Sequence, residues 1–334
     1  MKKITLILAL LILTPLIGQV VINEYSASNL YEYTDNYNME EDWIELYNSS
    51  ESDLDISGYY LSDKEDNPTK WAIPGGTIIS AEGFLTFWCS GRDESSGSNF
   101  HTNFKLKQAK NNPEHVVFSD PDGNIINDIE MQKTQLDHSM GRDMDDPESW
   151  RIFIHPTKGD ENLETNYIAY AEAATMSLEA GFYYGSIDLE ITTNEPNSTI
   201  RYTTNGNLPF FASSLYTGPI TISNTQVLKA IVYTTEPDIL PSFITFNTYF
   251  IDEDHALPVL STSANQLTTL LNGNQSLRPH GSIEYFNVEG ERKDFGYGEY
   301  NKHGQDSWAF PQRSFDYIAR DEMGYHDAIY EKLL

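Results

Sequence analysis

The sequence predicts a mainly β protein, with two tandem β-sandwiches followed by an incomplete domain of mixed α and β structure. Short β-rich runs alternate with clusters of Gly, Pro, Asn and Asp, which is typical of antiparallel sandwiches. No convincing helical period appears between residues 20 and 162. The chain has 334 residues, of which 39% are hydrophobic and 13% aromatic, so two or three packed domains are expected.

The first 19 residues have the pattern of a secretory signal peptide. Lys2 and Lys3 precede the apolar run 4–13, which is too short to span a bilayer. We expect cleavage after Gln19, with retention as an N-terminal anchor as the alternative. The predicted localisation is therefore secreted or cell surface, with no membrane span after cleavage.

The first sandwich is expected over residues 20–162. Its predicted strands include the runs 20–22, 43–47, 84–88 and 116–118, and turn signals stand at 57–58, 74–76 and 121–124. Alternation in the run 42–48 places Ile44 and Leu46 on one face and Glu45 on the other. We expect Glu45 to accept backbone amides or to pair with a cation near the end of the sheet.

The only cysteine, Cys89, excludes an intrachain disulfide. It follows the strand-like run 84–88, where a thiol packs as a small apolar group. A reactive or intermolecular thiol is the alternative. An exported chain without disulfides must draw its stability from apolar burial, which domains near a hundred residues can supply.

This unit opens with the motif Ile22-Asn23-Glu24-Tyr25, and the later motifs are the runs 42–48, 54–63, 71–74, 83–85, 104–106 and 141–142, then Trp150 and the run 156–162. The order of these motifs resembles the lamin-tail domain, an immunoglobulin-like sandwich. The resemblance implies an immunoglobulin-like fold and a secreted modular context. It implies no catalytic residue.

A second β-rich unit is expected over residues 165–252. The runs 185–191, 200–206, 214–220, 228–233 and 247–250 resemble the small β-sandwich at the C-terminus of chitobiase-type hexosaminidases. In those enzymes the chemistry belongs to a different domain, so glycosidase activity is not implied here. Asn205-Gly206 is predicted to form a tight turn between strands, and 255–258 a short link.

Residues 256–334 contain four runs in a characteristic order and spacing, at 257–261, 281–286, 296–307 and 311–315. They resemble the beginning of the spore-coat CotH kinase family, secreted proteins with an atypical kinase-like fold. The run 327–334 has the apolar spacing of a starting helix, and a helix that stops so soon buries little. We therefore expect a truncated α+β kinase-like domain that lacks its catalytic core.

The kinase resemblance implies ATP with Mg²⁺ or Mn²⁺ as cofactors of a full-length product, and none for this chain. Arg313 and Lys302 are the candidate contacts to nucleotide phosphates, and no catalytic residue is predicted. The family usually carries Lys where Arg313 stands. Arg can bind phosphate bidentately but has a different reach. The alternative for Arg313 is a surface ion pair, and Asp306 is expected in a turn.

Other catalytic and metal motifs are absent from the sequence. There is no H-E-x-x-H, G-x-S-x-G or Walker A pattern, and a single Cys excludes a thiolate zinc site. The sequence predicts no metal site. The alternative is that one of two acid-rich loops binds Ca²⁺, which takes six to eight oxygen ligands. Their acidic residues are Asp35, Glu40, Glu41 and Asp42 in one loop and Asp143, Asp145, Asp146 and Glu148 in the other.

These features predict an exported modular surface protein, whose sandwiches act as spacers or binding domains ahead of a CotH-like kinase domain. With 50 acidic and 21 basic residues, the net charge of −29 disfavours nucleic acid and anionic membranes. An extracellular protein or glycan is the expected partner. The alternatives are a non-enzymatic adhesive protein with a degenerate kinase-like segment, and a glycan-binding module that uses tyrosines in 31–37 and 183–184.

Overall fold

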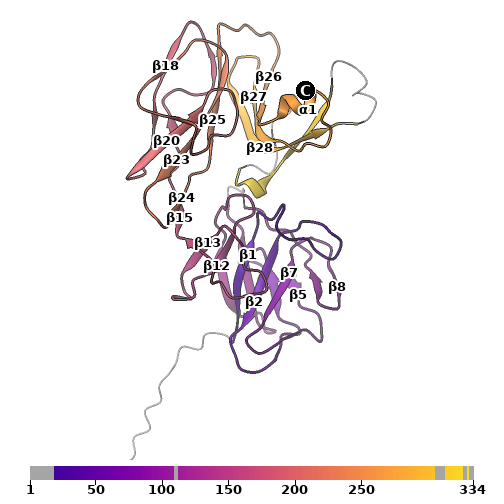
Figure 1. Cartoon of the computed structure of the whole chain (residues 1–334). Helices are drawn as coiled ribbons and strands as arrows, with labels where there is room; N and C mark the ends of the chain where they lie inside the picture. The colour runs from indigo at the N-terminus through magenta and orange to yellow at the C-terminus, as the bar shows by residue number, and fades with distance from the viewer. Residues whose placement is uncertain (1–18, 109–111, 305–312, 326–328, 331–334) are drawn as a thin grey trace, which may run out of the picture.

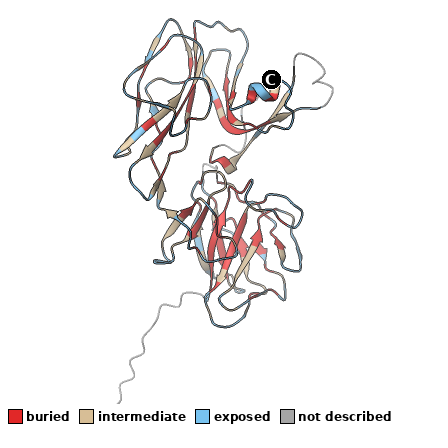
Figure 2. Cartoon of the chain, viewed as in Figure 1, coloured by how far each residue is buried: buried red, intermediate tan, exposed pale blue. Residues whose placement is uncertain are grey.

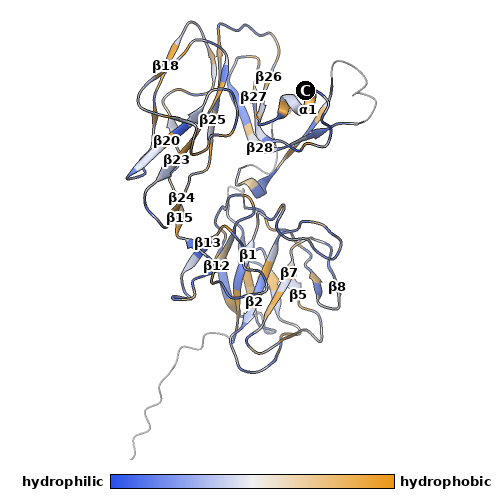
Figure 3. Ribbon diagram, viewed as in Figure 1, coloured by the Kyte–Doolittle hydropathy of each residue, from blue (hydrophilic) through white to orange (hydrophobic). Residues whose placement is uncertain are grey.

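The computed structural model describes residues 19–108, 112–304, 313–325 and 329–330. Over these residues the protein is mainly β, as predicted, and it forms three successive units (Figure 1). Apolar segments lie mainly on the strands, and the connections between them are mostly hydrophilic (Figure 3). No helix in the described ranges is long and apolar enough to cross a bilayer.

The first unit is a sandwich of an eight-stranded and a four-stranded sheet. Their neighbouring strands are antiparallel, except for the parallel pair β7 and β9. The strand orders are β14-β13-β12-β1-β2-β7-β9-β8 and β11-β10-β4-β5, and β3 pairs with β6. The strands are β1 (Val20–Ser26), β2 (Trp43–Asn48), β3 (Leu54–Asp55), β4 (Tyr60–Ser62), β5 (Trp71–Ala72), β6 (Ile78–Ile79), β7 (Phe84–Trp88), β8 (Glu94–Ser96), β9 (Asn99–His101), β10 (His115–Ser119), β11 (Ile125–Glu130), β12 (Ser139–Arg142), β13 (Trp150–Phe153) and β14 (Asn166–Tyr167).

The core of the first unit lies between these two sheets. Ile44 and Phe87 from the larger sheet belong to the same buried cluster as Leu61 and Phe118 from the smaller one. Figure 2 shows buried segments, in red, on the strands of this unit. Cys89 is fully buried in this cluster, so the prediction of a packed thiol is confirmed. Each of the four strand predictions falls within an observed strand. The large sheet continues to β14, beyond residue 162, where we expected the unit to end.

The second unit is also a β-sandwich. A five-stranded sheet, β17-β25-β23-β20-β21, faces the pairs β18-β22 and β16-β19, and β15 pairs with β24. The strands are β15 (Ala169–Tyr170), β16 (Thr175–Met176), β17 (Gly181–Tyr183), β18 (Ile187–Leu189), β19 (Ile191–Thr192), β20 (Ser198–Thr203), β21 (Ser214–Leu215), β22 (Ile220–Ile222), β23 (Gln226–Thr234), β24 (Ile239–Leu240) and β25 (Thr245–Ile251). Leu189 and Ile222 pack against Leu228 and Tyr249 in its core.

The tight turn predicted at Asn205-Gly206 is wrong. Gly206 has the expected positive φ of 75°, but the connection from β20 to β21 runs over residues 204–213. The amide of Gly206 donates to the carbonyl of Val227 instead of closing a two-residue hairpin. The local pattern therefore predicted the backbone conformation but not the length of the connection.

The third unit is an antiparallel sheet in the order β26-β27-β28-β29 with one short helix. Its elements are β26 (Val259–Ala264), α1 (Leu267–Leu271), β27 (His280–Phe286), β28 (Arg292–Lys302), β29 (Phe315–Ala319) and the 3₁₀ turn η2 (Asp321–Met323). The described residues do not show the predicted kinase-like α+β domain, since they contain one α-helix of five residues. The predicted helical start at 327–334 lies outside the described residues except for 329 and 330.

The three units share a small hydrophobic core. Leu30 from the first unit, Phe246 from the second, and Tyr297 and Met323 from the third form one buried cluster. The C-terminal segment around η2 reaches the first unit (Figure 1), where Gln108 Nε2 donates to the Asp321 carbonyl over 2.9 Å. The third unit therefore packs on both sandwiches.

Candidate functional site

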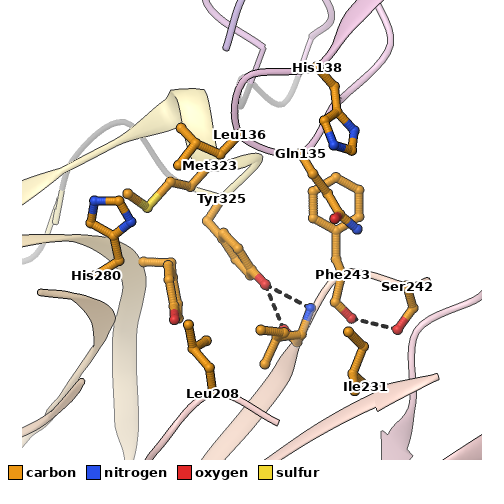
Figure 4. A pocket seen from close by; sticks show the side chains of 12 residues that line it. Gln135, Leu136, His138, Leu208, Ile231, Ser242, Phe243, His280, Met323 and Tyr325 are labelled. Carbon is orange, nitrogen blue, oxygen red and sulfur yellow. Dashed lines mark hydrogen bonds between the residues drawn. The ribbon is translucent and has the colours of Figure 1, made fainter. Parts of the chain in front are cut away.

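A pocket lies at the junction of the three units, with a volume of about 260 Å³. Its lining residues are Gln135, Leu136, His138, Leu208, Ile231, Ser242, Phe243, Ile244, His280, Tyr297, Met323 and Tyr325. Figure 4 shows the side chains converging from separate segments of the chain. A concave, mostly apolar site with a few polar groups is the common setting for small-molecule binding. We therefore take this pocket as the candidate site.

The first unit contributes the loop between β11 and β12. The Tyr170 hydroxyl accepts from the Gln135 amide over 2.9 Å and lies 2.7 Å from His138 Nδ1. The rings of Tyr170 and His138 also stack, with centroids 5.9 Å apart. Gln135 Nε2 donates to the carbonyl of Pro241 over 2.8 Å. These bonds attach the loop to Tyr170 at the start of the second unit and to Pro241 between β24 and β25, and so fix one wall of the pocket.

The second unit contributes residues 241–244, between β24 and β25. The Ser242 hydroxyl accepts from the amide of Val232 and donates to the carbonyl of Phe243, over 2.9 and 2.8 Å. The ring of Phe243 packs against Tyr170 and Tyr325, with centroid separations of 5.0 and 6.1 Å. Aromatic pairs at these separations stabilise a fixed arrangement. This segment forms the aromatic wall of the pocket.

The third unit closes the pocket through Tyr325 and His280. The Tyr325 hydroxyl donates to the carbonyl of Ile244 and accepts from its amide, over 2.8 and 2.9 Å (Figure 4). Gly324 precedes it with a φ of 78°, and a Cβ there would collide with the ring of Phe243. His280 Nε2 lies 2.7 Å from the hydroxyl of Tyr31 in the first unit. The pocket is therefore held by contacts among all three units.

The described part of the lining carries no fixed charge, because none of its residues is Asp, Glu, Lys or Arg. Burial lowers the pKa of His138 to about 4, and the neighbouring His155 adds to the effect. Burial also lowers the pKa of His280, against the opposing charge of Glu299. Both imidazoles are therefore neutral at pH 7. A charged ligand would lose its hydration without finding a counter-charge, so the pocket favours neutral molecules.

One lining group has an unmet hydrogen bond. The hydroxyl of Tyr297 is buried and has no partner among the described residues. Burial raises the pKa of Tyr297 well above its usual range, so the group stays protonated and can donate. An unpaired buried hydroxyl costs free energy, and an acceptor that reached it would lower this cost.

The residues predicted as phosphate contacts lie elsewhere in the third unit. Arg313 Nη1 donates to the Leu271 carbonyl at the end of α1 over 2.7 Å. Lys302 Nζ donates to Gln275 Oε1 over 2.7 Å. The structure thus brings both cations to the same segment, 271–275, where each is bonded to a neutral protein group. Contact with a nucleotide would require those bonds to be exchanged. Asp306 lies outside the described residues.

A buried carboxylate pair occupies the large sheet of the first unit. Glu24 and Glu45 are fully buried and stand opposite each other on β1 and β2. The hydroxyl of Thr157 donates to Glu24 over 2.7 Å, and the Gly159 amide donates to Glu45 over 2.5 Å. The prediction that Glu45 accepts a backbone amide is confirmed. The pair therefore anchors residues 156–162 across the sheet.

Burial and mutual repulsion shape the electrostatics of this pair. Burial raises the pKa of Glu45 to about 8, with the charge of Glu24 adding to the rise. Burial also raises the pKa of Glu24, against its hydrogen bonds to Ser139 and Thr157. Lys158 lies over the rings of Tyr33 and Trp88, at 4.9 and 5.2 Å from their centroids. Its ammonium partly offsets the negative charge of the two carboxylates.

The acid-rich loops use several of their carboxylates internally. Asp35 accepts amides from Tyr37 and Met39 and pairs with Arg92 over 2.7 Å. Glu41 pairs with Arg92 and with Lys105. In the second loop, Asp143 pairs with Arg151 over 2.7 Å, and Asp146 accepts from Ser149. Some oxygens that a Ca²⁺ ion would need are thus already engaged by protein donors.

Two protein-family models match parts of the first two units. Residues 14–133 match the Lamin Tail Domain. Residues 178–238 match the Chitobiase/beta-hexosaminidase C-terminal domain. These matches confirm the two resemblances predicted for the sandwiches. No curated protein matches the chain. Neither family match extends into residues 256–334, which carry the resemblance to CotH kinases.

Sequence reasoning missed the junction pocket. Its lining residues lie in seven separate parts of the sequence, at 135–138, 208, 231, 242–244, 280, 297 and 323–325, and no motif connects them. Aromatic residues such as Phe243 and Tyr325 give no signal of a pocket, because they are equally common in ordinary strands and loops.

Proposed function

We propose that this protein is an exported modular binding protein, and that the pocket at the junction of its three units holds a small uncharged ligand. The proposal rests on the observation that all three units build one aromatic-lined pocket without a charged residue in its described lining. The buried hydroxyl of one lining residue, Tyr297, has no partner among the described residues. A ligand with an apolar ring and one hydrogen-bond acceptor fits this chemistry. The volume of about 260 Å³ suits a single ring with short substituents.

A matched set of probes tests the binding proposal. Benzyl alcohol, benzoate and benzylammonium have similar size and differ in charge. We expect benzyl alcohol to bind, and both ions to bind at least about tenfold more weakly, because the lining offers no counter-charge. Isothermal titration of the intact protein measures the three affinities. Equal affinities, or no binding of the alcohol, would contradict the proposal.

Two tyrosine variants locate the binding. Tyr297→Phe removes only the unpartnered hydroxyl and should weaken benzyl alcohol binding severalfold. Tyr184→Phe is the matched control, because Tyr184 is 82% exposed and does not line the pocket. Circular dichroism and the melting temperature check that both variants fold. Unchanged binding by Tyr297→Phe would remove this hydroxyl from the site.

Export is the second part of the proposal, and it is supported by the charge and hydropathy pattern of residues 1–19. Expression with the native N-terminus in a bacterial host should release a protein that begins at Val20. N-terminal sequencing of the exported fraction checks this. A product that still begins at Met1 would contradict cleavage and favour a retained anchor.

A CotH-like kinase role is the second candidate function. Its support is the resemblance of residues 256–334, together with the position of Lys302 and Arg313 at the two ends of the segment that joins β28 to β29. This role predicts that ATP with Mg²⁺ binds the protein and that Arg313→Ala abolishes binding while Tyr184→Phe does not. Calorimetry measures both. Failure of ATP to bind would favour the non-enzymatic binding or adhesive role.

A further inference from the structure

Three metal-ligating side chains meet on the outer face of the small sheet in the first unit, and none of them lines the junction pocket. They are Glu65, His115 and Asp128. One donor atom from each lies within 4.8 Å of the others. We propose that these residues bind a divalent transition-metal cation such as Zn²⁺.

The sheet register explains why these residues meet. Strands β4, β10 and β11 are neighbours, and Val117 on β10 stands opposite both Ser62 on β4 and Asp128 on β11. His115 is two residues from Val117 and therefore shares its face. Residues in diagonal positions on adjacent strands can contact each other. The outer face thus presents the imidazole and the Asp128 carboxylate side by side.

The third donor is placed by the loop that leaves β4. The amide of His115 donates to the carbonyl of Asp63 over 3.1 Å, which holds residues 63–65 beside the start of β10. The Asp63 carboxylate is occupied by Lys70 at 2.5 Å. Glu65 is exposed, and within the described residues it has no hydrogen-bond or ion-pair partner. Its carboxylate is free to turn toward the other two donors.

The local charge favours a cation. His115 Nδ1 lies 2.6 Å from Asp128 Oδ1, and this is the contact that the structure gives Asp128. Glu65 brings a second carboxylate to the same place. Two carboxylates close together repel each other, and a divalent cation between them removes that repulsion. The overall charge of −29 also raises the cation concentration near the surface.

The donor set indicates the class of metal. One imidazole nitrogen and two carboxylate oxygens suit Zn²⁺, Co²⁺ or Mn²⁺ better than Ca²⁺ or Mg²⁺, which prefer oxygen ligands alone. Donors around a Zn²⁺ ion at about 2.0–2.2 Å from the metal lie about 3–3.5 Å from one another. The three side chains are at least partly exposed and can close from 4.8 Å by rotation. Three protein donors leave a fourth position for water or a ligand.

Zinc titration of the tag-free, chelator-treated full chain tests the site. Isothermal titration with ZnCl₂ should show one site that His115→Ala and Asp128→Asn abolish. Glu65→Gln should weaken it at least about tenfold, because it removes one charged ligand and keeps the size of the side chain. Mg²⁺ should not compete. Melting curves recorded without metal check that each variant is folded.

A second His–Asp pair in the protein supplies the control. His303 Nδ1 lies 2.6 Å from Asp316 Oδ1, the same separation as in the proposed site, but outside the three-donor group. His303→Ala should leave zinc affinity and stoichiometry unchanged. Zn²⁺ should also raise the melting temperature of the wild type and of His303→Ala, and not that of His115→Ala.

Two results would overturn the proposal. One is a wild type that binds no Zn²⁺ in the titration. The other is zinc binding that survives in His115→Ala, which would mean that the ion binds elsewhere on the acidic surface. Cobalt spectroscopy gives an independent readout, because a nitrogen-ligated Co²⁺ band should be present in the wild type and absent in His115→Ala.

Discussion

Burial decides the behaviour of single ionisable residues in this protein. Glu24 and Glu45 are fully buried in one sheet, and Lys229 is fully buried between the second and third units. Each keeps hydrogen-bond partners, yet burial shifts the pKa of each toward its neutral form. Such groups link folding stability to pH.

Glu45 should make the protein less stable as the pH rises. Burial raises its pKa from 4.5 to about 8, so the folded state holds a proton that the unfolded state has lost. Its contribution is complete below about pH 4.5 and is lost as the pH rises to about 8. Urea unfolding at several pH values between 5 and 8 gives the free energy of unfolding as a function of pH. This free energy should fall less steeply with rising pH in Glu45→Gln than in the wild type. Identical slopes in the two proteins would contradict this assignment.

Lys229 should act in the opposite direction at higher pH. Burial lowers its pKa from 10.5 to about 7, so stability should rise as the pH increases between these values. Its ammonium makes one hydrogen bond, to the carbonyl of Ser263 at 3.2 Å. Lys229→Met keeps the length of the side chain. It should reduce the increase of the free energy of unfolding with pH, and it should stabilise the protein at pH 6. Unfolding curves at pH 6 and 9 measure both effects. An equal change of the free energy of unfolding between these pH values in the wild type and in Lys229→Met would rule the assignment out.

At the scale of elements, close strand contacts depend on a few residues without side chains. Gly298 on β28 stands opposite Ala319 on β29, and a Cβ at this glycine would collide with the backbone of Ile318. The collision is with main chain, which cannot move aside as a flexible side chain could. This glycine therefore permits the pairing of the two strands.

Gly298→Ala should separate β29 from β28. We expect a loss of stability of about 1–3 kcal/mol or more, as for other overpacked sites, and faster amide exchange in β29. Gly75→Ala is the matched control, because a Cβ there meets nothing within 4 Å. Hydrogen exchange and chemical unfolding measure the two variants. Equal stability of the two would mean that β29 does not depend on this close approach.

At the scale of the whole molecule, the shared core should make the three units unfold together. Met323 from the third unit packs with Leu30 and Phe246 from the two sandwiches. Met323→Ala should cost about 2–5 kcal/mol of packing and uncouple the third unit. Calorimetry should show one transition for the wild type and two for this variant. Ile125→Ala, at a position 44% exposed, is the control and should keep one transition.

Local sequence patterns determined the two sandwiches, the burial of Cys89 and the amide contact of Glu45. Strand alternation, turn residues and family motifs lie within short runs, so the chain specifies them without knowledge of distant contacts. The length of the connection after Gly206 escaped this reasoning, because a glycine with positive φ suits several kinds of turn.

Only the tertiary structure decided which distant residues meet. The pocket joins His138 to Tyr297, and the proposed metal site joins Glu65 to Asp128, across segments that no motif links. Strand order and packing set these contacts, and the period of two along a strand fixes its faces but not its neighbours. The sequence by itself therefore determined the modules and their faces, while the packing of those faces created the sites.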